Sequence, residues 1–359
     1  MKPISLATSK ITQEIRDNVN KALDDNRIAQ GEFNTLFESK VAKYMEVKHA
    51  IGVCNGSMAD IISLAVLKSL RSDKTEVIVP ALTFIAQTNA VIANGLKPVF
   101  VDVGEDYQIN MNSVWNAITD KTLAVMVVHL LGRDCQAERL ATVLNYGRPN
   151  IFIVEDCCEA YGGSVRDKKF GTFGDFGTFS FFPSHTITTG EGGMLITNDD
   201  NLADLARACR NHGRMPGVGI LDMFHFPIFG FNGKMNNLSA AVGCAVVDTA
   251  DKVIQIRRRN VRWYNELLNR GWYASSPHCY PVKYGIEKLR DKALLRLQEN
   301  KIEARKLFSC LPTQEKVYAN LGYKEGDFPI AEKIGKTHLF VPVHQDLTKS
   351  QIQRIVKYL

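Results

Sequence analysis

Short apolar runs alternate with helical patterns through the middle of the chain. Between several of these runs, apolar residues recur at three- and four-residue spacing, which predicts helices over 85–94 and 112–118. Strands that alternate with helices are typical of a largely parallel sheet covered on both faces. The pattern therefore predicts a large α/β domain. The runs rich in Val, Ile and Phe that predict its strands are 76–79, 98–103, 123–130, 151–155, 176–182 and 194–197.

Helical spacing also marks the segments on either side of this region. It predicts helices over 32–45 and 58–70, and a single long helix with few breakers over 237–269. Such a helix would lead from the large domain into a smaller C-terminal α+β domain. We therefore expect a large domain over 1–250 and a small domain over 251–359.

Composition and charge narrow the functional classes. The chain has 359 residues, is 45% hydrophobic and carries a formal charge of +6, which is modest for its length. Its densest basic piece, Arg257-Arg258-Arg259, lies inside a helical pattern without an aromatic platform, so we expect no nucleic-acid partner. The longest apolar runs, such as 123–131, are far shorter than the roughly 20 residues of a membrane helix. With no secretory signal at Met1, we expect a cytoplasmic protein without a membrane partner.

The cysteines spell out no metal motif. None of the eight forms a C-x-x-C pair, so neither a zinc site nor an iron–sulfur site is indicated, and we expect reduced thiols and no metal. The eight cysteines are at positions 54, 135, 157, 158, 209, 244, 279 and 310.

Candidate chemistry lies at the ends of predicted strands and starts of predicted helices. Asp156 follows the strand over 151–155, and strand ends are where open α/β sheets bind ligands. A helix cap or salt bridge is an alternative for Asp156, as a capping box is for Glu159. Gly56 and Ser57 begin a helix, whose free N–H groups suit a phosphate, although glycine and serine start many helices.

The sequence does not match the common nucleotide-binding motifs. Gly171, Gly174 and Gly177 are spaced by threes, which is not the dinucleotide pattern. The Gly-Lys-Thr at 335–337 lacks the first glycine of a P-loop, because residue 330 is Ile. Neither a dinucleotide nor a nucleoside triphosphate is predicted as cofactor.

Taken in order, several short segments carry a family likeness. They are "NGSMAD", "VPALTF", "VEDCCEA", "GTFSFFPSHTITTGEGGMLITND", "RNHGR" and "GFNGKMNNLSAAVG". This series resembles the DegT/DnrJ/EryC1/StrS family of sugar aminotransferases from about Gly31 to "VPVHQDLT" near the C-terminus. The resemblance implies the aspartate aminotransferase fold, PLP fold type I, with a mostly parallel mixed sheet. It also implies pyridoxal 5′-phosphate or pyridoxamine 5′-phosphate as cofactor.

The resemblance assigns roles around the cofactor ring. Asp156 matches the carboxylate that pairs with the protonated pyridine nitrogen and keeps the ring an electron sink. Phe84 matches the aromatic residue that stacks on the ring. Glu159 stands where the aminotransferases usually have glutamine.

The resemblance also predicts which residues bind the cofactor phosphate. Gly56, Ser57 and Ser180 match the phosphate cradle, and Asn232 matches an asparagine that reaches the phosphate of the neighbouring subunit. A homodimer with a shared active site is thereby implied. Lys234 departs from the common "N-x-R-x-x-E-x-Q" pattern, which puts the subunit contacts and the choice of substrate in doubt.

One residue departs from the aminotransferase pattern at the centre of the site. Position 185 is the lysine that holds the cofactor in the family's aminotransferases, and here it is His185. Imidazole has no primary amine, so the cofactor must be held without a covalent bond. Family members with histidine here are sugar 3-dehydratases, and "GTFSFFPSHTI" with "VVHLLG" resembles the GDP-4-keto-6-deoxy-D-mannose 3-dehydratase type.

This resemblance predicts C3 dehydration of a nucleotide-linked 4-keto-6-deoxyhexose, with L-glutamate as amino donor and His185 as general acid–base residue. Two alternatives stay open: an aminotransferase whose lysine was replaced by His185, and an inactive homologue that binds cofactor or sugar. A dehydratase that needs an iron–sulfur cluster is disfavoured, because only Cys279 and Cys310 lie beyond residue 244, although "EARKLF" also resembles those enzymes.

Substrate-binding candidates are less sharply defined. Arg210 and Arg305 offer bidentate guanidinium donors for a carboxylate or diphosphate, and His129 and His344 are further candidates. A structural role is an alternative for both arginines and for His129. The segment 212–229, rich in Gly, Pro and aromatic residues, is predicted to be a substrate or dimer loop.

Overall fold

The computed structural model describes residues 2–148, 150–215, 219, 224–308 and 311–359. The helices in this part of the chain are α1 (Gln13–Asp24), α2 (Glu32–Met45), α3 (Gly56–Leu70), α4 (Ile85–Ala93), α5 (Met111–Ala117), α6 (Ala137–Gly147), α7 (Asp200–Arg210), α8 (Asn237–Val246), α9 (Ala250–Leu268), α10 (Glu287–Glu299), α11 (Pro329–Thr337) and α12 (Lys349–Lys357). The strands are β1 (His49–Val53), β2 (Glu76–Pro80), β3 (Lys97–Val101), β4 (Thr122–Val128), β5 (Phe152–Asp156), β6 (Ser164–Val165), β7 (Lys168–Lys169), β8 (Phe176–Ser180), β9 (Gly193–Thr197), β10 (Cys279–Lys283), β11 (Arg305–Lys306) and β12 (His338–Pro342).

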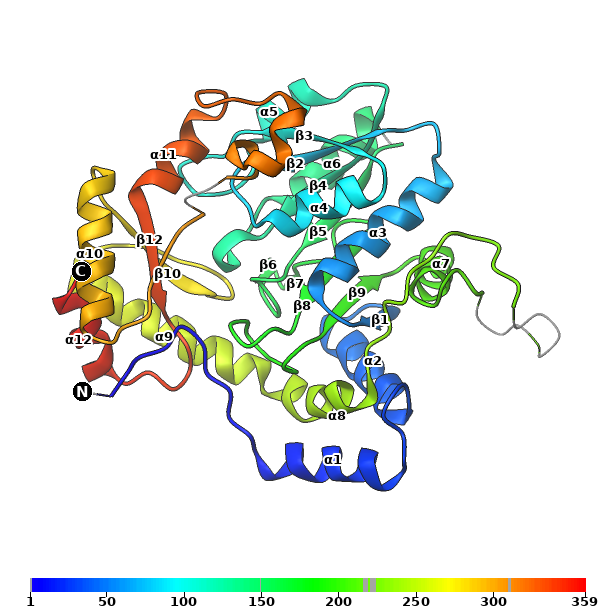
Figure 1. Cartoon of the computed structure of the whole chain (residues 1–359), viewed down its shortest axis with the longest axis horizontal. Coiled ribbons are helices and arrows are strands. Elements are labelled where there is room, and N and C mark those ends of the chain that lie inside the picture. Colours follow the sequence, from blue (N-terminus) through cyan, green and yellow to red (C-terminus); the bar gives the residue numbers. More distant parts are fainter. Residues whose placement is uncertain (1, 149, 216–218, 220–223, 309–310) are drawn as a thin grey trace.

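A seven-stranded sheet in the order β1-β9-β8-β5-β4-β2-β3 forms the centre of the molecule (Figure 1). Neighbours from β8 to β3 are parallel, whereas β9 is antiparallel to both β8 and β1. The prediction of a mostly parallel mixed sheet is therefore confirmed. All six predicted strands are present, with ends that differ by a few residues, and the edge strand β1 was not predicted as a strand.

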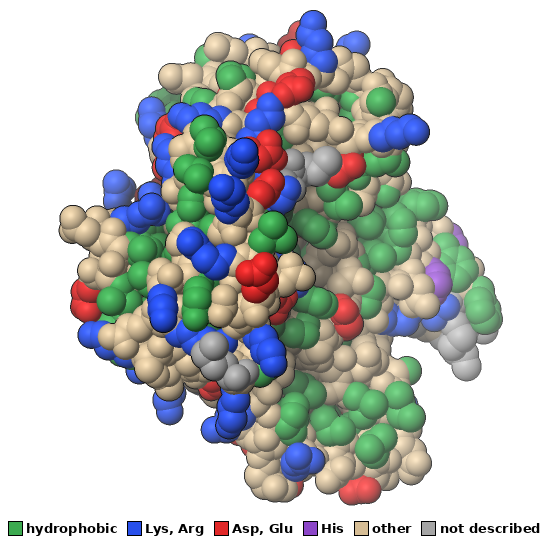
Figure 2. Space-filling view, turned by 60° about the vertical axis from the view of Figure 1, so that its left-hand side comes forward, with side chains coloured by type: hydrophobic (Ala, Val, Ile, Leu, Met, Phe, Trp, Pro, Cys, Tyr) green, Lys and Arg blue, Asp and Glu red, His purple; other side chains and the backbone are tan. Residues whose placement is uncertain are grey.

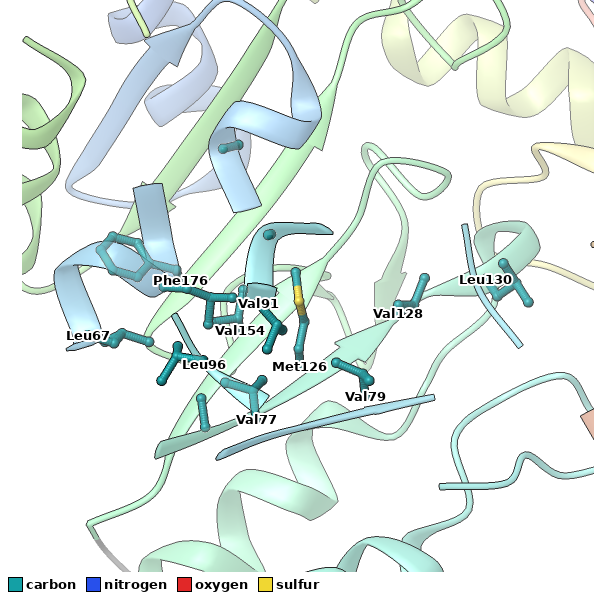
Figure 3. Packing of buried hydrophobic residues seen from close by; sticks show 14 of the residues in the cluster. Leu67, Val77, Val79, Val91, Leu96, Met126, Val128, Leu130, Val154 and Phe176 are labelled. Atoms are coloured by element: carbon teal, nitrogen blue, oxygen red, sulfur yellow. The ribbon is translucent and has the colours of Figure 1, made fainter. Parts of the chain in front are cut away.

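Side chains alternate between the two faces of this sheet and give each face its own core. Val77 and Val79 pack with Met126 in the cluster under α3 and α4, and Figure 3 shows part of this packing. Ile78 and Val125, one residue out of step, pack with α5 and α6 on the opposite face. This period of two is what a sheet buried on both faces requires, because successive strand side chains point to opposite sides.

The C-terminal part forms a smaller layer beside the sheet (Figure 1). Its antiparallel sheet has the order β10-β12-β11 and packs with α10, α12 and the second half of α9. Figure 2 shows Lys and Arg side chains spread over the face where this part comes forward. The α+β character of this part is as predicted, and the boundary between residues 250 and 251 remains a prediction.

The prediction of one continuous helix over 237–269 is wrong. A 3-10 turn at Val247–Thr249 divides this segment into α8 and α9. The Lys40 ammonium donates to the Cys244 carbonyl at 2.9 Å and to the Asp248 carboxylate at 2.7 Å, so contacts from α2 engage the chain where the helix breaks. No helix-breaking residue stands at this point of the sequence. The two helices instead pack against different partners, α8 against α1 and α2 and α9 against α12, so tertiary packing explains the break.

A tight contact joins the large sheet to the C-terminal part. Gly132 has a φ of +77°, and a Cβ atom added there would lie 1.7 Å from the Ser276 carbonyl oxygen. The Ser276 N–H in turn donates to the Gly132 carbonyl at 3.1 Å. Only glycine permits this approach, since it combines a positive φ with the absence of a side chain.

We expect Gly132→Ala to destabilise the protein by more than about 2 kcal/mol, because a backbone clash is added to the strain of a positive φ. Gly95→Ala is the matched control: Gly95 has a φ of +66° and nothing within 4 Å of an added Cβ, so it should lose only about 1 kcal/mol. Urea unfolding of both variants measures the difference. An equal decrease in the free energy of unfolding for both variants would show that the contact with Ser276 does not contribute to stability.

Candidate active site

Asp156 ends β5 at the carboxyl edge of the parallel strands and is buried. Its Oδ1 accepts the Cys158 N–H at 2.9 Å, and its Oδ2 accepts the Gln87 side-chain amide. Gln87 is held by the Thr83 hydroxyl, which donates to its Oε1 at 3.0 Å. Burial raises the pKa of Asp156 more than its hydrogen bonds from Cys158 and Gln87 and the charge of His129 lower it, so its negative charge is incompletely compensated. A protonated ring nitrogen would supply the missing compensation.

Asp60 adds a second buried carboxyl group from α3. Its Oδ1 accepts the Thr178 hydroxyl at 2.7 Å, while its Oδ2 is buried without a hydrogen-bond partner among the described residues. Burial and then the Asp156 charge raise the pKa of Asp60 well above its usual value. Sequence analysis missed this residue, although an acid in the otherwise apolar start of α3 was a signal.

The predicted phosphate cradle comes together at the N-terminus of α3. A Cβ atom added to Gly56 would lie 2.7 Å from the Ser180 Cβ and 2.9 Å from the Cys158 Sγ, so the first turn of α3 and the end of β8 are in close contact. The Asn55 side chain caps the helix by accepting the Met58 N–H at 2.8 Å. This leaves the first N–H groups of the helix, beside exposed Ser57, suited to an anion.

Two predicted cofactor contacts are exposed in this chain. Phe84, the N-cap of α4, is 59% exposed, although a large apolar side chain is expected to be covered. Asn232 is exposed as well and forms an isolated antiparallel bridge with Asn211. Both positions are therefore open to a ligand or to another chain.

His185 lies in the turn between β8 and β9 and is partly buried. Its carbonyl accepts the Arg257 guanidinium at 2.7 Å, and its Nδ1 is buried without a partner among the described residues. Burial and then the nearby Arg257 charge lower the pKa of His185 to about 3. The imidazole is thus neutral at physiological pH and able to accept a proton.

Glu159 and His278 complete the cluster. The His185 and His278 ring centroids are 5.2 Å apart, and the His278 Nε2 lies 3.8 Å from the Glu159 Oε1. The other carboxylate oxygen of Glu159 accepts the Leu131 N–H at 2.7 Å. Burial raises the pKa of Glu159 to about 7. His278 was missed by sequence analysis, because it precedes β10 in the C-terminal part and no local motif marks it.

His129 has a structural role in the core. It is completely buried, its Nε2 lies 3.0 Å from the Glu155 carboxylate, and its ring stacks on Phe170 at 4.1 Å between centroids. No surface of this side chain is open to a substrate, which corrects the substrate-binding hypothesis for it. Tertiary packing decides this, since a histidine after a strand is compatible with either role.

A metal ion has one candidate set of ligands among the described residues, namely His129, Glu155 and Cys157. The Glu155 oxygens already accept backbone N–H groups from Gly171, Phe173 and Gly174 at 2.6–2.9 Å. A metal would have to displace these bonds, so we assign none to the cluster. Cys310, the last cysteine of the chain, lies outside the described residues.

The other substrate candidates differ in burial and in their partners. Arg210 donates to Glu38 at 2.5 Å and to the Gly52 carbonyl at 2.8 Å, which favours its structural alternative. Arg305 is 63% exposed and pairs with Glu303 at 2.9 Å, so it remains a candidate. His344 is buried, its Nε2 lies 3.1 Å from the Ser5 carbonyl, and burial lowers its pKa to about 4.

The predicted loop over 212–229 is only partly within the described residues, because 216–218 and 220–223 lie outside them. Phe224 and Phe229 are 79% and 78% exposed. The Arg214 guanidinium lies 5.8 Å from the centre of the Phe224 ring and 5.5 Å from that of Phe226.

Comparison with known proteins identifies the class to which this fold and site belong. Residues 9–359 match the DegT/DnrJ/EryC1/StrS aminotransferase family. The chain is 37% identical to GDP-perosamine synthase of Caulobacter vibrioides, over 99% of this chain and 97% of that protein. Among solved structures, E. coli GDP-4-keto-6-deoxy-D-mannose-3-dehydratase with bound hydrated PLP is 27% identical, with a TM-score of 0.89 and all of both chains covered. A structure of GDP-4-keto-6-deoxymannose-3-dehydratase with a trapped PLP–glutamate geminal diamine is 25% identical, with a TM-score of 0.89, over 99% of this chain and all of that one.

The chain therefore belongs to the DegT/DnrJ/EryC1/StrS family of PLP-dependent sugar aminotransferases. It has the PLP fold type I, and its cofactor is pyridoxal 5′-phosphate or pyridoxamine 5′-phosphate, as the sequence predicted. Among the described residues, every helix is too short or too polar to span a bilayer.

We expect Asp60→Asn to stabilise the cofactor-free protein at pH 8 by about 1 to 3 kcal/mol, because it removes a buried charge with an unpaired oxygen. The folded pKa of Asp60 lies above the unfolded value near 4, so its destabilising effect is absent below that value, grows as pH rises from there to the folded pKa, and is complete above it. The gain should therefore be smaller at pH 5. Urea unfolding at both pH values measures it, and a gain that does not change with pH would contradict this account.

Proposed function

We propose that the protein catalyses C3 dehydration of a nucleotide-linked 4-keto-6-deoxyhexose. The observation that carries the proposal is His185 at the position where the family resemblance implies a lysine. An imidazole cannot bond covalently to the cofactor as lysine does, but it can move protons. The similarity to two structures of a GDP-sugar 3-dehydratase supports the same reaction.

In this proposal, different residues bind the ring and the phosphate of the cofactor. The Asp156 carboxylate pairs with the ring nitrogen, and the first turn of α3 with Ser57 and Ser180 receives the phosphate. Phe84 stacks on the ring. When bound, the cofactor supplies an electron sink for breaking bonds next to the carbon that carries its amino group.

His185 performs the proton transfers. Its lowered pKa keeps it neutral at pH 7. With the cofactor amine joined to C4 of the sugar, His185 can therefore take a proton from the cofactor carbon that bears this amine, and the electron pair of that C–H bond expels the C3 oxygen. The same low pKa makes the resulting imidazolium a strong acid, which readily gives the proton to the departing C3 oxygen. The hydroxyl leaves as water, and ammonia is lost when the nitrogen-bearing product hydrolyses to a 4-keto-3,6-dideoxy sugar.

L-glutamate is the proposed amino donor that regenerates the cofactor amine. A solved relative contains a PLP–glutamate adduct, which supports glutamate for this chain. GDP is the proposed nucleotide, because the 37% identical relative and the dehydratase structures carry GDP sugars in their names.

A homodimer with a shared active site is also proposed. Asn232 is exposed at the base of the 212–231 segment, and Phe84 lies exposed at the cofactor site. Phe182, next to the His185 turn, is 46% exposed. A second copy that covers these side chains would remove apolar surface from water and bring an Asn232 side chain to its neighbour's phosphate.

The second candidate is a sugar aminotransferase, and the similarity to GDP-perosamine synthase favours it. An aminotransferase would retain the nitrogen on the sugar, whereas the dehydratase releases it as ammonia. The two reactions therefore differ in their products.

Incubation of the protein with pyridoxal phosphate, glutamate and GDP-4-keto-6-deoxymannose tests the choice. We expect ammonia in step with 2-oxoglutarate, and a product that mass spectrometry finds one oxygen lighter than the substrate. A stable 4-amino sugar without ammonia would establish the aminotransferase instead, and no product at all would favour the inactive homologue.

Variants of His185 test its role in that reaction. His185→Asn should lower kcat by about 10²- to 10⁴-fold, the usual contribution of a general acid–base residue, while the protein still binds the cofactor. His185→Lys should form a covalent bond to pyridoxal phosphate, which borohydride makes permanent and mass spectrometry detects on residue 185. Full dehydratase activity in His185→Asn would contradict the proposed role.

A further inference from the structure

A buried arginine links the segment that carries His278 to the turn that carries His185. Arg257, on α9, is 2% exposed, and its guanidinium donates to the His185 carbonyl at 2.7 Å and to the Pro277 carbonyl at 3.3 Å. One rigid cation thus fixes the backbone beside both imidazoles. Arg257 keeps its charge, since burial lowers its pKa only to about 10.

Further contacts support the same juxtaposition. The Thr186 and Ser276 hydroxyls lie 3.3 Å apart, and the Ser276 hydroxyl donates to the Tyr161 carbonyl at 2.7 Å. The clash that a side chain at Gly132 would make with Ser276 shows how closely this segment packs. The separation of the His185 and His278 rings is therefore set by several independent contacts.

His278 lies between His185 and a carboxyl group. Its ring is 5.2 Å from that of His185, and its Nε2 is 3.8 Å from the Glu159 Oε1. The Nδ1 atoms of both rings are buried and have no partner among the described residues. No hydrogen bond joins the two rings, but each has a free buried nitrogen, so a bridging water or a small rotation of one ring would let the pair share a proton. Purely structural histidines usually have both nitrogens bonded.

We propose that His278 is the proton partner of His185, shares with it the proton that His185 takes up during the reaction, and is positioned by Arg257. This inference rests on the proposed acid–base role of His185. The proton enters at His185, is held by the His185–His278 pair next to Glu159, and leaves from His185 on the departing C3 oxygen. Protons balance, and no additional reactant is needed.

The charged and titratable groups that face the pair favour a single shared proton. Burial and Arg257 lower the pKa of His185. Burial, His185, Arg257 and Arg305 on β11 lower the pKa of His278, so a second positive charge on the pair is disfavoured. Glu159 faces His278 from the segment after β5 and offsets one positive charge when it is ionised.

The first test uses cofactor-free protein and therefore does not depend on the reaction. The ring resonance of His185, assigned by its loss in His185→Asn, is followed against pH by NMR. In His278→Gln it should titrate at higher pH, because a neutral amide replaces the group that competes for the proton. His338→Gln removes another buried histidine of the C-terminal part, whose ring meets that of Tyr107 edge to face, and should leave the His185 titration unchanged. The same result for both variants would overturn the proposal.

The second test measures turnover. His278→Ala should lower kcat by about 10- to 100-fold with KM for the nucleotide sugar within twofold, and added imidazole should restore part of the rate. His338→Ala should show no rescue by imidazole. A His278→Ala enzyme with the wild-type kcat and pH profile would refute the relay, while absence of dehydration by the wild type would refute the proposed function and leave the NMR result standing.

Discussion

The Arg257 guanidinium is the contact on which the candidate site depends most. It reaches from α9 to the His185 carbonyl and to the Pro277 carbonyl, so it joins a turn of the large sheet to the segment that enters the C-terminal sheet. A buried arginine is tolerated here because its planar fork donates to two carbonyl groups at once, although its Nε has no partner among the described residues. Without it, two carbonyl oxygens and two imidazole-bearing segments would lose their common anchor.

The candidate site has buried carboxyl groups in one region and buried histidines beside Arg257 in another. At the end of β5 and the start of α3, burial raises the pKa values of Asp156 and Asp60, so the negative charges of this region are incompletely compensated. On the opposite side, burial and Arg257 lower the pKa values of His185 and His278, so this region resists a further positive charge. A cofactor with a cationic ring nitrogen at one end and a proton-transfer reaction at the other fits this polarity.

Family membership and reaction rest on different evidence. The match over nearly the whole chain shows the sugar aminotransferase family and its cofactor, but relatives of this chain include enzymes named for an amino sugar and for a 3-dehydration. In the proposed function, residue 185 separates these chemistries, because an amine there would bond to the cofactor whereas an imidazole would only move protons. The fold supports both reactions, and function is a property of the site.

The sequence by itself determined the strand and helix pattern, the mostly parallel sheet and the strand-end position of Asp156, because periodicity of apolar residues and strand polarity are local or topological properties. It also supplied the family, and with it Gly56, Ser57, Ser180 and His185, since these lie in contiguous motifs. Only the tertiary structure decided the break between α8 and α9, where Lys40 engages the chain, and the burial of His129 against Glu155. It alone revealed His278, Asp60 and Arg257, because each owes its role to neighbours from distant segments. Local pattern specifies which element a residue belongs to, whereas pKa, burial and partnership depend on packing between elements.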